Sequence, residues 1–295
     1  MARITLIERA NAKINLHLDV LGKRADGFHE IESLMQSVSL SDELIFTLDR
    51  NEERSISLKI EGNDSLPNDE NNLILRAVKE YEEHRPIEGK LDILLKKRIP
   101  TEAGLGGGSA DAAATLRALN KLSSNPLDDT DLFSMAASLG SDVPFCLRGG
   151  THICRGRGDL LSHTKPLKNL HLVIINSGER VSTPKAYSDL DKAFGDFKGV
   201  DGRIDVNTAA SSLHQGSDIK LFNIFEEVVI PLCPIAKSAK EALISLGASA
   251  ALMSGSGATV FGIFNSREMA KNAEKALKDK FRFVEYAETI SHFCK

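Results

Sequence analysis

A cluster of glycines is the strongest chemical signal in this sequence. The stretch Gly104-Leu105-Gly106-Gly107-Gly108-Ser109 precedes the alanine-rich run Ala110-Asp111-Ala112-Ala113-Ala114, which predicts a helix from Ser109 to about Asn120. Glycine has no Cβ, so backbone N–H groups can converge there, and a helix start favours an anion. The loop therefore predicts a site for phosphate or another anion. The alternative is a tight glycine turn without a ligand.

The loop matches neither of the two common nucleotide-binding loops. No Lys-Ser or Lys-Thr pair follows the last glycine, as a Walker A loop requires. Position 109 is serine, and the expected helix does not lie in a βαβ unit, which argues against a dinucleotide-binding loop. A lysine-free loop has to obtain its positive charge from a metal ion and from side chains elsewhere in the chain.

Two charged residues are candidates for acid–base chemistry. Asp142 lies in Gly140-Ser141-Asp142-Val143-Pro144, between a predicted helix end and a predicted strand over residues 145–147. Functional side chains gather in such connections, and a carboxylate there could accept a hydroxyl proton. Lys13 lies on the polar face of a predicted strand. Spacing alone leaves plainer interpretations open, in which Asp142 caps a turn and Lys13 is a solvated lysine.

A second glycine turn, Ser254-Gly255-Ser256-Gly257, leads into a predicted strand over residues 259–264. The turn could approach phosphates, or it could pack against the other domain. The sequence leaves both interpretations open.

Composition excludes several classes of partner. The chain has 295 residues, 42% of them hydrophobic and 26% charged, with a formal net charge of −4. This composition is typical of a globular protein, and the charge gives no footprint for nucleic acid or an anionic membrane. The cysteines form no C-x-x-C pair, which argues against a zinc site or a disulfide framework; they are Cys146, Cys154, Cys233 and Cys294.

No apolar signal segment is visible at the N-terminus. Residues 242–266 carry no charge and are long enough to span a bilayer. The glycine turn near their middle instead favours a helix, a turn and a buried strand. We therefore expect a cytoplasmic protein without a membrane or nucleic-acid partner.

The predicted elements mix strands and helices without strict βαβ alternation, so the fold class is α+β. Alternation over residues 12–20 predicts a half-buried strand, with Ile14 and Leu16 inward and Lys13 and Asn15 outward. Residues 195–216 are expected to form an insertion or loop. Further strands are predicted at 44–48, 56–60, 91–96, 151–154, 170–175 and 283–287, and helices at 128–140, 222–231, 234–246 and 266–280. Another helix is predicted after Asn71 as its N-cap, with one apolar face made of Leu73, Ile74, Ala77, Val78 and Tyr81.

The glycine loop, Gly140–Pro144 and Ser254–Gly257, in this order, resemble the GHMP kinases. Within that family the resemblance is closest to the branch that phosphorylates a hydroxyl of a cytidine diphosphate-linked methylerythritol, and it extends over nearly the whole chain. The segments that carry this resemblance are 12–16, 24–29, 72–74, 181–184, 221–223 and 253–261.

The resemblance implies a two-domain GHMP kinase fold. Residues 1–163 would form an N-terminal α/β domain with the ATP loop and the catalytic residues, and residues 164–295 a C-terminal ferredoxin-like domain. It also implies ATP and Mg²⁺, a small-molecule cytidine diphosphate-linked substrate, a role in non-mevalonate isoprenoid synthesis, and a monomer or weak homodimer.

The resemblance also assigns roles to residues. Asp142 would take the acceptor hydroxyl's proton, and Lys13 would stabilise charge on the attacking oxygen. The cytosine would stack between Phe28 and Tyr187, with His29 reading its edge. The implied ATP-binding residues are Pro100, Thr101, Glu102, Ala103, Gly104, Leu105, Gly106, Gly107, Gly108, Ser109, Ala110, Asn72 and Lys97, and the implied substrate-binding residues are Asn15, Phe28, His29, Thr183, Tyr187 and Gly255. The sequence does not decide the Mg²⁺ ligand, for which Ser109 and Asp142 are the candidates.

Two positions depart from the family's pattern. Phe28 stands where tyrosine is common, and Glu102 brings a negative charge close to a phosphate loop, where we expect it to point away. Two rival functions stay open: a family member acting on mevalonate or homoserine, and a non-catalytic anion-binding protein. The cytosine-site residues argue against the first, and the presence of both Lys13 and Asp142 argues against the second.

Overall fold

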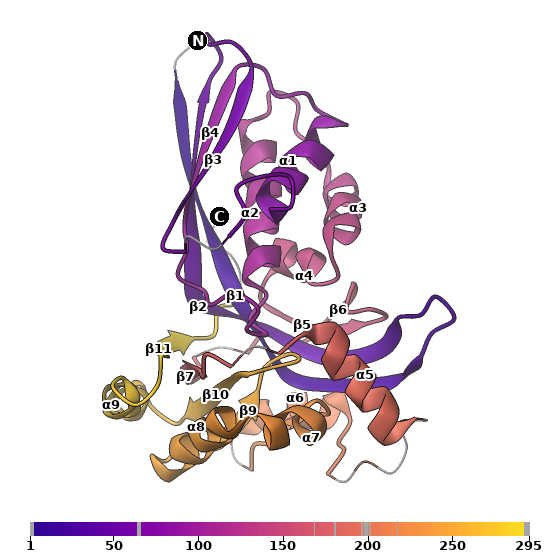
Figure 1. Cartoon of the computed structure of the whole chain (residues 1–295), viewed down its shortest axis with the longest axis vertical. Coiled ribbons are helices and arrows are strands. Elements are labelled where there is room, and N and C mark those ends of the chain that lie inside the picture. Colours follow the sequence, from indigo (N-terminus) through magenta and orange to yellow (C-terminus); the bar gives the residue numbers. More distant parts are fainter. Residues whose placement is uncertain are drawn as a thin grey trace. The chain divides into compact units, whose positions relative to one another are not determined.

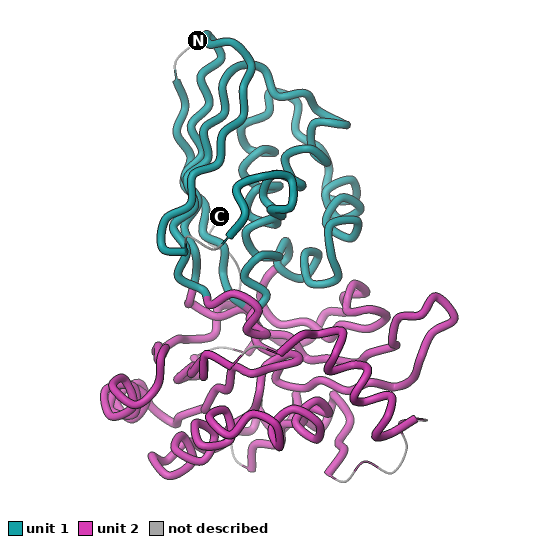
Figure 2. The backbone as a smooth tube through the Cα atoms, in the orientation of Figure 1, with its two compact units in different colours: residues 1–12, 41–99, 106–148 teal, residues 13–40, 100–105, 149–295 magenta. Residues whose placement is uncertain are grey.

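The computed structural model describes residues 3–63, 66–167, 169–179, 181–195, 197, 200, 202–216 and 218–291, so Cys294 lies outside the described residues. Figure 2 shows the chain divided into two compact units. Unit 1 contains residues 1–12, 41–99 and 106–148, and unit 2 contains residues 13–40, 100–105 and 149–295. The chain therefore passes between the units several times, and the predicted domain boundary at residue 163 stays a prediction.

Two long strands, β1 (Ile4–Lys23) and β2 (His29–Asp49), are neighbours and run through both units. In unit 1, β2 pairs antiparallel with β4 (Lys90–Lys96), placing Leu44 opposite Leu95. Strand β4 pairs in parallel with β3 (Ser55–Glu61). The strands predicted at 44–48, 56–60 and 91–96 are confirmed.

The helices of unit 1 lie on one side of these strands (Figure 1). Helix α1 buries Ile74, Ala77, Val78 and Tyr81, the apolar face that the sequence predicts, but its N-cap is Asn72 instead of Asn71. Helix α2 is alanine-rich and almost wholly buried, because small side chains let its neighbours approach closely. The bounds are α1 Leu73–Glu82, α2 Gly107–Leu122, α3 Asp129–Leu139 and α4 Val143–Arg148.

Unit 2 contains a four-stranded antiparallel sheet in the order β11-β7-β10-β9. With helices α8 and α9 packed against it, the chain order β7-α8-β9-β10-α9-β11 is the ferredoxin-like arrangement. The predicted α+β class and ferredoxin-like domain are therefore confirmed. The bounds are β7 His171–Asn176, α8 Pro234–Ser245, β9 Ala250–Met253, β10 Thr259–Phe264, α9 Arg267–Leu277 and β11 Phe283–Glu288.

The remaining elements of unit 2 include short strands that extend the sheet of β1 and β2. Strand β5 pairs antiparallel with β2 and with β6, and β8 pairs in parallel with β1, placing His17 beside Phe222. The bounds are β5 Thr151–Arg155, β6 Leu160–His163, α5 Thr183–Phe194, α6 Val206–Gln215, β8 Phe222–Asn223, α7 Glu226–Val229 and a short 3-10 turn at Ile230–Leu232.

Three predictions of local structure are wrong. Residues 145–147 belong to helix α4, because a short apolar run does not by itself distinguish a strand from a helix. Residues 195–216 include helix α6, which begins where the side chain of Asp205 accepts from the N–H groups of Asn207 and Thr208. The helix expected at 222–231 is divided among β8, α7 and the 3-10 turn.

The strand over residues 12–20 is also not half-buried. Its apolar side chains are buried as predicted, but so are Lys13, Asn15, His17 and Asp19 on its other face. The uncharged residues 242–266 form the end of α8 and strands β9 and β10. Among the described residues, no helix is both long enough and apolar enough to cross a membrane.

Candidate active site

The glycine loop is shared between the units: residues 100–105 lie in unit 2, and the residues from Gly106 onward lie in unit 1. Helix α2 begins at Gly107, two residues before the predicted start, so Gly107, Gly108 and Ser109 form its first turn. Gly106 is the N-cap with φ +66°, a conformation that favours glycine. The first N–H groups of a helix have no acceptor within it, and no acidic residue lies in this turn. The turn therefore suits an anion.

Space around Gly107 is tight, although its φ is one that other residues adopt. A Cβ built at this position would lie 3.0 Å from Ile99 Cγ2 and 3.1 Å from Lys97 Nζ. The first turn of α2 thus packs directly on the end of the segment that follows β4. A side chain at position 107 would therefore require the side chains of Ile99 and Lys97 to shift slightly.

Beneath this turn, Lys97 forms a buried ion-pair cluster with two aspartates. Its Nζ lies 2.5 Å from Asp42 Oδ2 and 2.6 Å from Asp111 Oδ2, and the exposed fractions of the three side chains are 3%, 0% and 5%. The second oxygen of Asp42 accepts from the backbone N–H groups of Arg98, at 2.5 Å, and Ile99, at 2.8 Å. The cluster therefore joins β2, the residues after β4 and the second turn of α2.

The charges in this cluster are unequally compensated. Burial raises the pKa of Asp111 well above its usual value; Lys97 opposes this shift and Asp42 adds to it. Burial alone would lower the pKa of Lys97, but the two carboxylates outweigh it and raise that pKa. Asp111 Oδ1 is buried and has no hydrogen-bond partner in the described part of the chain. One ammonium is thus shared by two carboxylates, and the raised pKa of Asp111 favours its protonated form.

Two of the predicted nucleotide-binding residues, Lys97 and Asn72, already have side-chain partners within unit 1. The ammonium of Lys97 is in the ion-pair cluster, so a contact with ribose would have to break an ion pair. Asn72 caps α1, where its Oδ1 accepts from Ile74 N at 2.9 Å and its Nδ2 donates to Pro67 O at 2.7 Å. Direct nucleotide contacts by these two residues stay predictions.

Asp142 is the residue before α4, in the turn after α3, and not the residue before a strand. Its carbonyl accepts from Cys146 N at 3.0 Å. Arg117 of α2, which the sequence did not single out, holds the same helix by donating to Cys146 O at 3.0 Å and to Arg9 O at 3.0 Å. The backbone that carries Asp142 is therefore fixed to α2 and to the start of β1.

In unit 2, Lys13 begins a chain of buried hydrogen bonds. Its Nζ donates to Asn15 Oδ1 at 2.8 Å, Asn15 Nδ2 donates to Ser33 Oγ at 2.8 Å, and Ser33 Oγ donates to His17 O at 2.6 Å. Both ends of the Asn15 amide are used in this chain, so it orients Lys13. Ser33 lies on β2, and no spacing in the sequence links it to Lys13.

The start of the glycine loop packs against β1 and the second glycine turn. Lys13 N donates to Leu105 O at 2.9 Å, and Ser254 Oγ donates to Gly104 O at 2.9 Å. Gly104 has φ +73°, and a Cβ there would lie 2.0 Å from Ser254 O, so only glycine fits. The turn Ser254–Gly257 therefore packs on the start of the glycine loop within unit 2, and its approach to phosphates stays a prediction. Asn223 Nδ2 donates to Gly255 O at 2.8 Å and holds the turn in place.

The residues expected at the cytosine site also lie in unit 2. The rings of His29 and Tyr187 are stacked at 4.6 Å and 23°. His29 Nε2 lies 2.7 Å from Asp191 Oδ1 of α5. Phe28 is 51% exposed, and Arg157 Cζ lies 5.1 Å over its ring. His29 covers one face of Tyr187, so a base between Phe28 and Tyr187 stays a prediction.

Two further predicted positions are also accounted for. Thr183 begins α5, and its Oγ1 lies 2.8 Å from Ser256 Oγ in the second glycine turn. Glu102 is exposed, as its charge suggests, and has φ +52°.

Among the described residues, no group of three or more histidine, cysteine, aspartate or glutamate side chains could hold a metal ion. Ser109 offers a single neutral oxygen for the predicted Mg²⁺.

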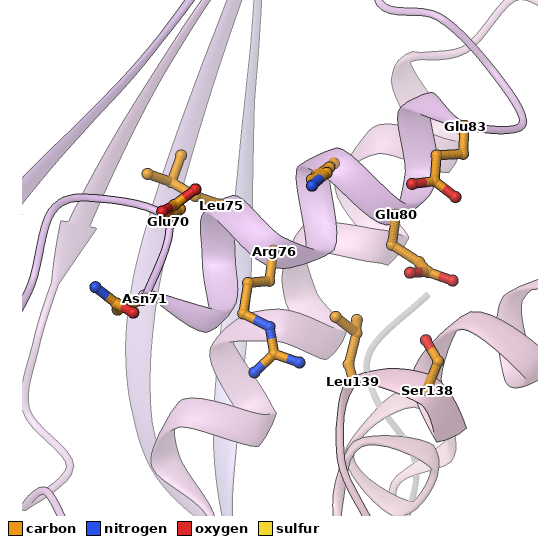
Figure 3. Close-up of a pocket in the computed structure, with 9 residues that line it drawn as sticks. Glu70, Asn71, Leu75, Arg76, Glu80, Glu83, Ser138 and Leu139 are labelled. Atoms are coloured by element: carbon orange, nitrogen blue, oxygen red, sulfur yellow. The ribbon is translucent and has the colours of Figure 1, made fainter.

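A hollow of about 650 Å³ in unit 1 lies between α1 and α3 (Figure 3). Its lining contains both acidic and basic side chains and includes none of the predicted site residues. In Figure 3, Arg76 of α1 and Leu139 of α3 face this hollow. Its other lining residues are Glu70, Asn71, Leu75, Lys79, Glu80, Glu83 and Ser138.

Comparison with known protein families gives two matches. The model of the GHMP kinases N terminal domain matches residues 72–150, and that of the GHMP kinases C terminal region matches residues 203–282. The first match contains the helix start at Gly107 and Asp142. The second contains the turn at Ser254–Gly257.

Two relatives that are similar over most of the chain carry the same name. A Macrococcus caseolyticus protein named 4-diphosphocytidyl-2-C-methyl-D-erythritol kinase is 38% identical over 277 residues, covering 92% of this chain and 95% of that protein. A Pelotomaculum thermopropionicum protein of the same name is 42% identical over 266 residues, covering 89% and 90%.

Two solved structures are also similar to this chain over most of its length. A crystal structure of 4-(cytidine 5'-diphospho)-2C-methyl-D-erythritol kinase is 35% identical, with a TM-score of 0.80, and the match covers 96% of this chain and 99% of that one. The L. major mevalonate kinase, solved with R-mevalonate, has a TM-score of 0.74 at 17% identity, over 99% of this chain and 98% of that one. The second similarity concerns the fold alone.

Proposed function

The chain belongs to the GHMP kinase family, and we propose that it transfers the γ-phosphoryl group of ATP to the 2-hydroxyl of 4-diphosphocytidyl-2-C-methyl-D-erythritol. The observation that carries this proposal is the identity of 38% and 42%, over about nine-tenths of the chain, to relatives named for this kinase activity. The helix start at Gly107 supports the donor half of the reaction. The His29 site supports the acceptor half.

The nucleotide phosphates bind at the first turn of α2. Its free N–H groups and the helix dipole supply partial positive charge. The Ser109 hydroxyl in this turn fits Mg²⁺, which commonly keeps several waters and is held by few protein oxygens together with substrate phosphates. Bound there, Mg²⁺ supplies charge neutralisation for the transferring phosphoryl group.

Lys13 and Asp142 carry the chemical step. The acceptor oxygen forms a bond to the γ-phosphorus as the bond from that phosphorus to the β,γ-bridging oxygen breaks, and ADP leaves. The hydroxyl proton passes to the carboxylate of Asp142. The Lys13 ammonium, oriented by Asn15, stabilises negative charge on the reacting oxygens.

The acceptor is bound through its cytidine. Phe28 and Tyr187 offer rings on which the cytosine stacks, and such stacking does not depend on the identity of the base. Identity is read by His29 through a hydrogen bond to the base edge. Thr183 and Gly255 border the substrate near the second glycine turn.

The product belongs to the non-mevalonate route to isoprenoid precursors. We propose that the protein acts in the cytoplasm as a monomer or weak homodimer, with domains divided near residue 163. The cysteine pattern, which has no C-x-x-C pair and fits a reducing compartment, supports the cytoplasmic part of this proposal.

The decisive experiment is an ATP-consumption assay with purified protein and Mg²⁺ across three acceptors: the cytidyl compound, mevalonate and homoserine. We expect turnover with the cytidyl compound alone and a new phosphate monoester at the tertiary carbon, seen by ³¹P NMR. Turnover of mevalonate or homoserine without turnover of the cytidyl compound would refute the proposal.

A further inference from the structure

Asp191 binds the candidate base-reading histidine on one side and a lysine on the other. Its Oδ1 lies 2.7 Å from His29 Nε2, and its Oδ2 accepts from Lys23 Nζ at 2.8 Å. The exposed fraction of the His29 side chain is 8%, and that of Asp191 is 28%. The pair is thus largely shielded from water. No motif in the sequence links Asp191 to His29, which lies 162 residues away.

The imidazole ring of His29 is held in one orientation. It stacks on Tyr187 at 4.6 Å and 23°, and it meets the ring of Phe197 edge to face at 5.8 Å and 82°. Tyr187 itself packs edge to face on Phe225 at 4.9 Å. With aromatic rings on two sides, the imidazole cannot exchange its two nitrogens without disturbing this packing.

The carboxylate decides which ring nitrogen carries the hydrogen. Burial alone would raise the pKa of Asp191, but the hydrogen bonds from Lys23 and His29 and their charges outweigh it and lower that pKa. An ionised carboxylate only accepts hydrogen bonds, so in the neutral imidazole Nε2 carries the hydrogen and donates. Nδ1 then holds a lone pair and can only accept.

We infer that Asp191 is a positioning residue that fixes the tautomer of His29 and thereby makes the acceptor site selective for cytosine over uracil. The inference rests on the proposed function, in which His29 faces the base edge. The 4-amino group of cytosine donates, so it satisfies Nδ1. The 4-oxo group of uracil accepts, so it would place two acceptors against each other in a shielded site. A carboxylate that sets the tautomer of a histidine from behind is a common arrangement in metal sites.

The test compares Asp191→Asn with Asp189→Asn. Asp189 lies on the same helix, pairs with Lys185 and Lys192, and makes no hydrogen bond or ion pair with His29 among the described residues, so its variant controls for loss of a helix carboxylate. The first measurement is the ¹H–¹⁵N NMR spectrum of His29 in the protein without substrate. We expect hydrogen on Nε2 in the wild type and in Asp189→Asn, and a mixture of tautomers in Asp191→Asn.

The second measurement is kcat/KM for the cytidyl acceptor and for its uridyl counterpart. Because the substitution weakens the net contribution of one hydrogen bond, we expect Asp191→Asn to lower the preference for cytidine by about 5- to 10-fold. The change should appear in KM, with kcat nearly unchanged. Asp191→Glu, which keeps a carboxylate, should restore part of the preference, and it also serves if the asparagine variant folds poorly.

The outcomes separate this inference from the proposed function. An unchanged His29 spectrum in Asp191→Asn overturns the tautomer assignment whatever the activity is. A changed spectrum with an unchanged base preference overturns the role in selectivity, while the kinase activity stands. If the wild type phosphorylates neither acceptor, the proposed function fails, and the assignment to cytosine fails with it.

Discussion

Replacing Lys97 by methionine removes the one ammonium that two buried carboxylates share. The substitution keeps most of the side-chain length but leaves Asp42 and Asp111 in a site where all three side chains are at most 5% exposed. Removing one partner of a buried ion pair costs about 3–5 kcal/mol. Two features place the cost near the lower end of that range. Asp42 keeps two backbone donors, and Asp111, whose pKa is already raised, can take up a proton.

The variant should therefore lose about 3 kcal/mol of unfolding free energy, measured by urea denaturation at pH 7.5. The loss should be smaller at pH 5. A carboxyl whose pKa is raised in the folded state contributes stability below its unfolded value, 3.8 for Asp111, and that contribution is lost as pH rises through the folded pKa. Removing Lys97 raises that pKa further, so the variant's stability should fall more steeply with increasing pH than that of the wild type.

A double variant, Lys97→Met with Asp111→Asn, distinguishes positioning from direct contact with the nucleotide. If Lys97 acts by holding the first turn of α2, removing the like charge should recover part of the stability, together with part of the ATP affinity. If Lys97 binds the ribose directly, ATP affinity stays low although stability returns. A loss below 1 kcal/mol in the single variant at pH 7.5 would refute the reasoning, because it would mean that the cluster is hydrated.

Three further substitutions test the site. Asp142→Asn should lower kcat by at least about 100-fold, a typical general-base contribution, and leave the Kd for ATP nearly unchanged; near-normal turnover would remove Asp142 from the mechanism. Phe28→Ala should weaken binding of the cytidyl acceptor by about 1–3 kcal/mol, measured by calorimetry, with an unchanged Kd contradicting the stacking assignment. Gly104→Ala should raise the KM for ATP, because a Cβ would lie 2.0 Å from Ser254 O; an unaffected variant would show that the loop shifts freely.

The sequence predicted the parts of this protein that depend on local pattern. The glycine loop before a helix, the buried face of α1 and strands β7, β10 and β11 of the ferredoxin-like sheet follow from spacing and composition, whereas strand β9 was not predicted. Helix α4 did not, because its six residues are too few for periodicity to decide between helix and strand. Helix α6 was not predicted either, because its segment is rich in residues that are typical of turns.

Burial of the polar residues on β1, and of Lys97 after β4, could not be predicted either. Asn15 is satisfied by Ser33, 18 residues away, and Lys97 by Asp42, 55 residues away. No motif encodes such separations, because the partners meet only after the strands have paired. A single polar residue in a strand pattern is therefore assigned to solvent by default, and its burial becomes visible only through its partner.

The charge balance of the glycine loop constrains how this family member can bind a nucleotide. The sequence shows that no lysine follows the loop, so the cation in contact with the phosphates has to come from elsewhere. Lys97 lies directly beneath the first turn of α2, but its charge is matched or exceeded by two carboxylates, so the cluster offers the phosphates no net positive charge. Lys97 therefore cannot replace a Walker A lysine. On the proposed function, neutralisation of the phosphates then depends on backbone N–H groups, on Mg²⁺ brought with ATP and on Lys13, whose ammonium is already oriented by Asn15.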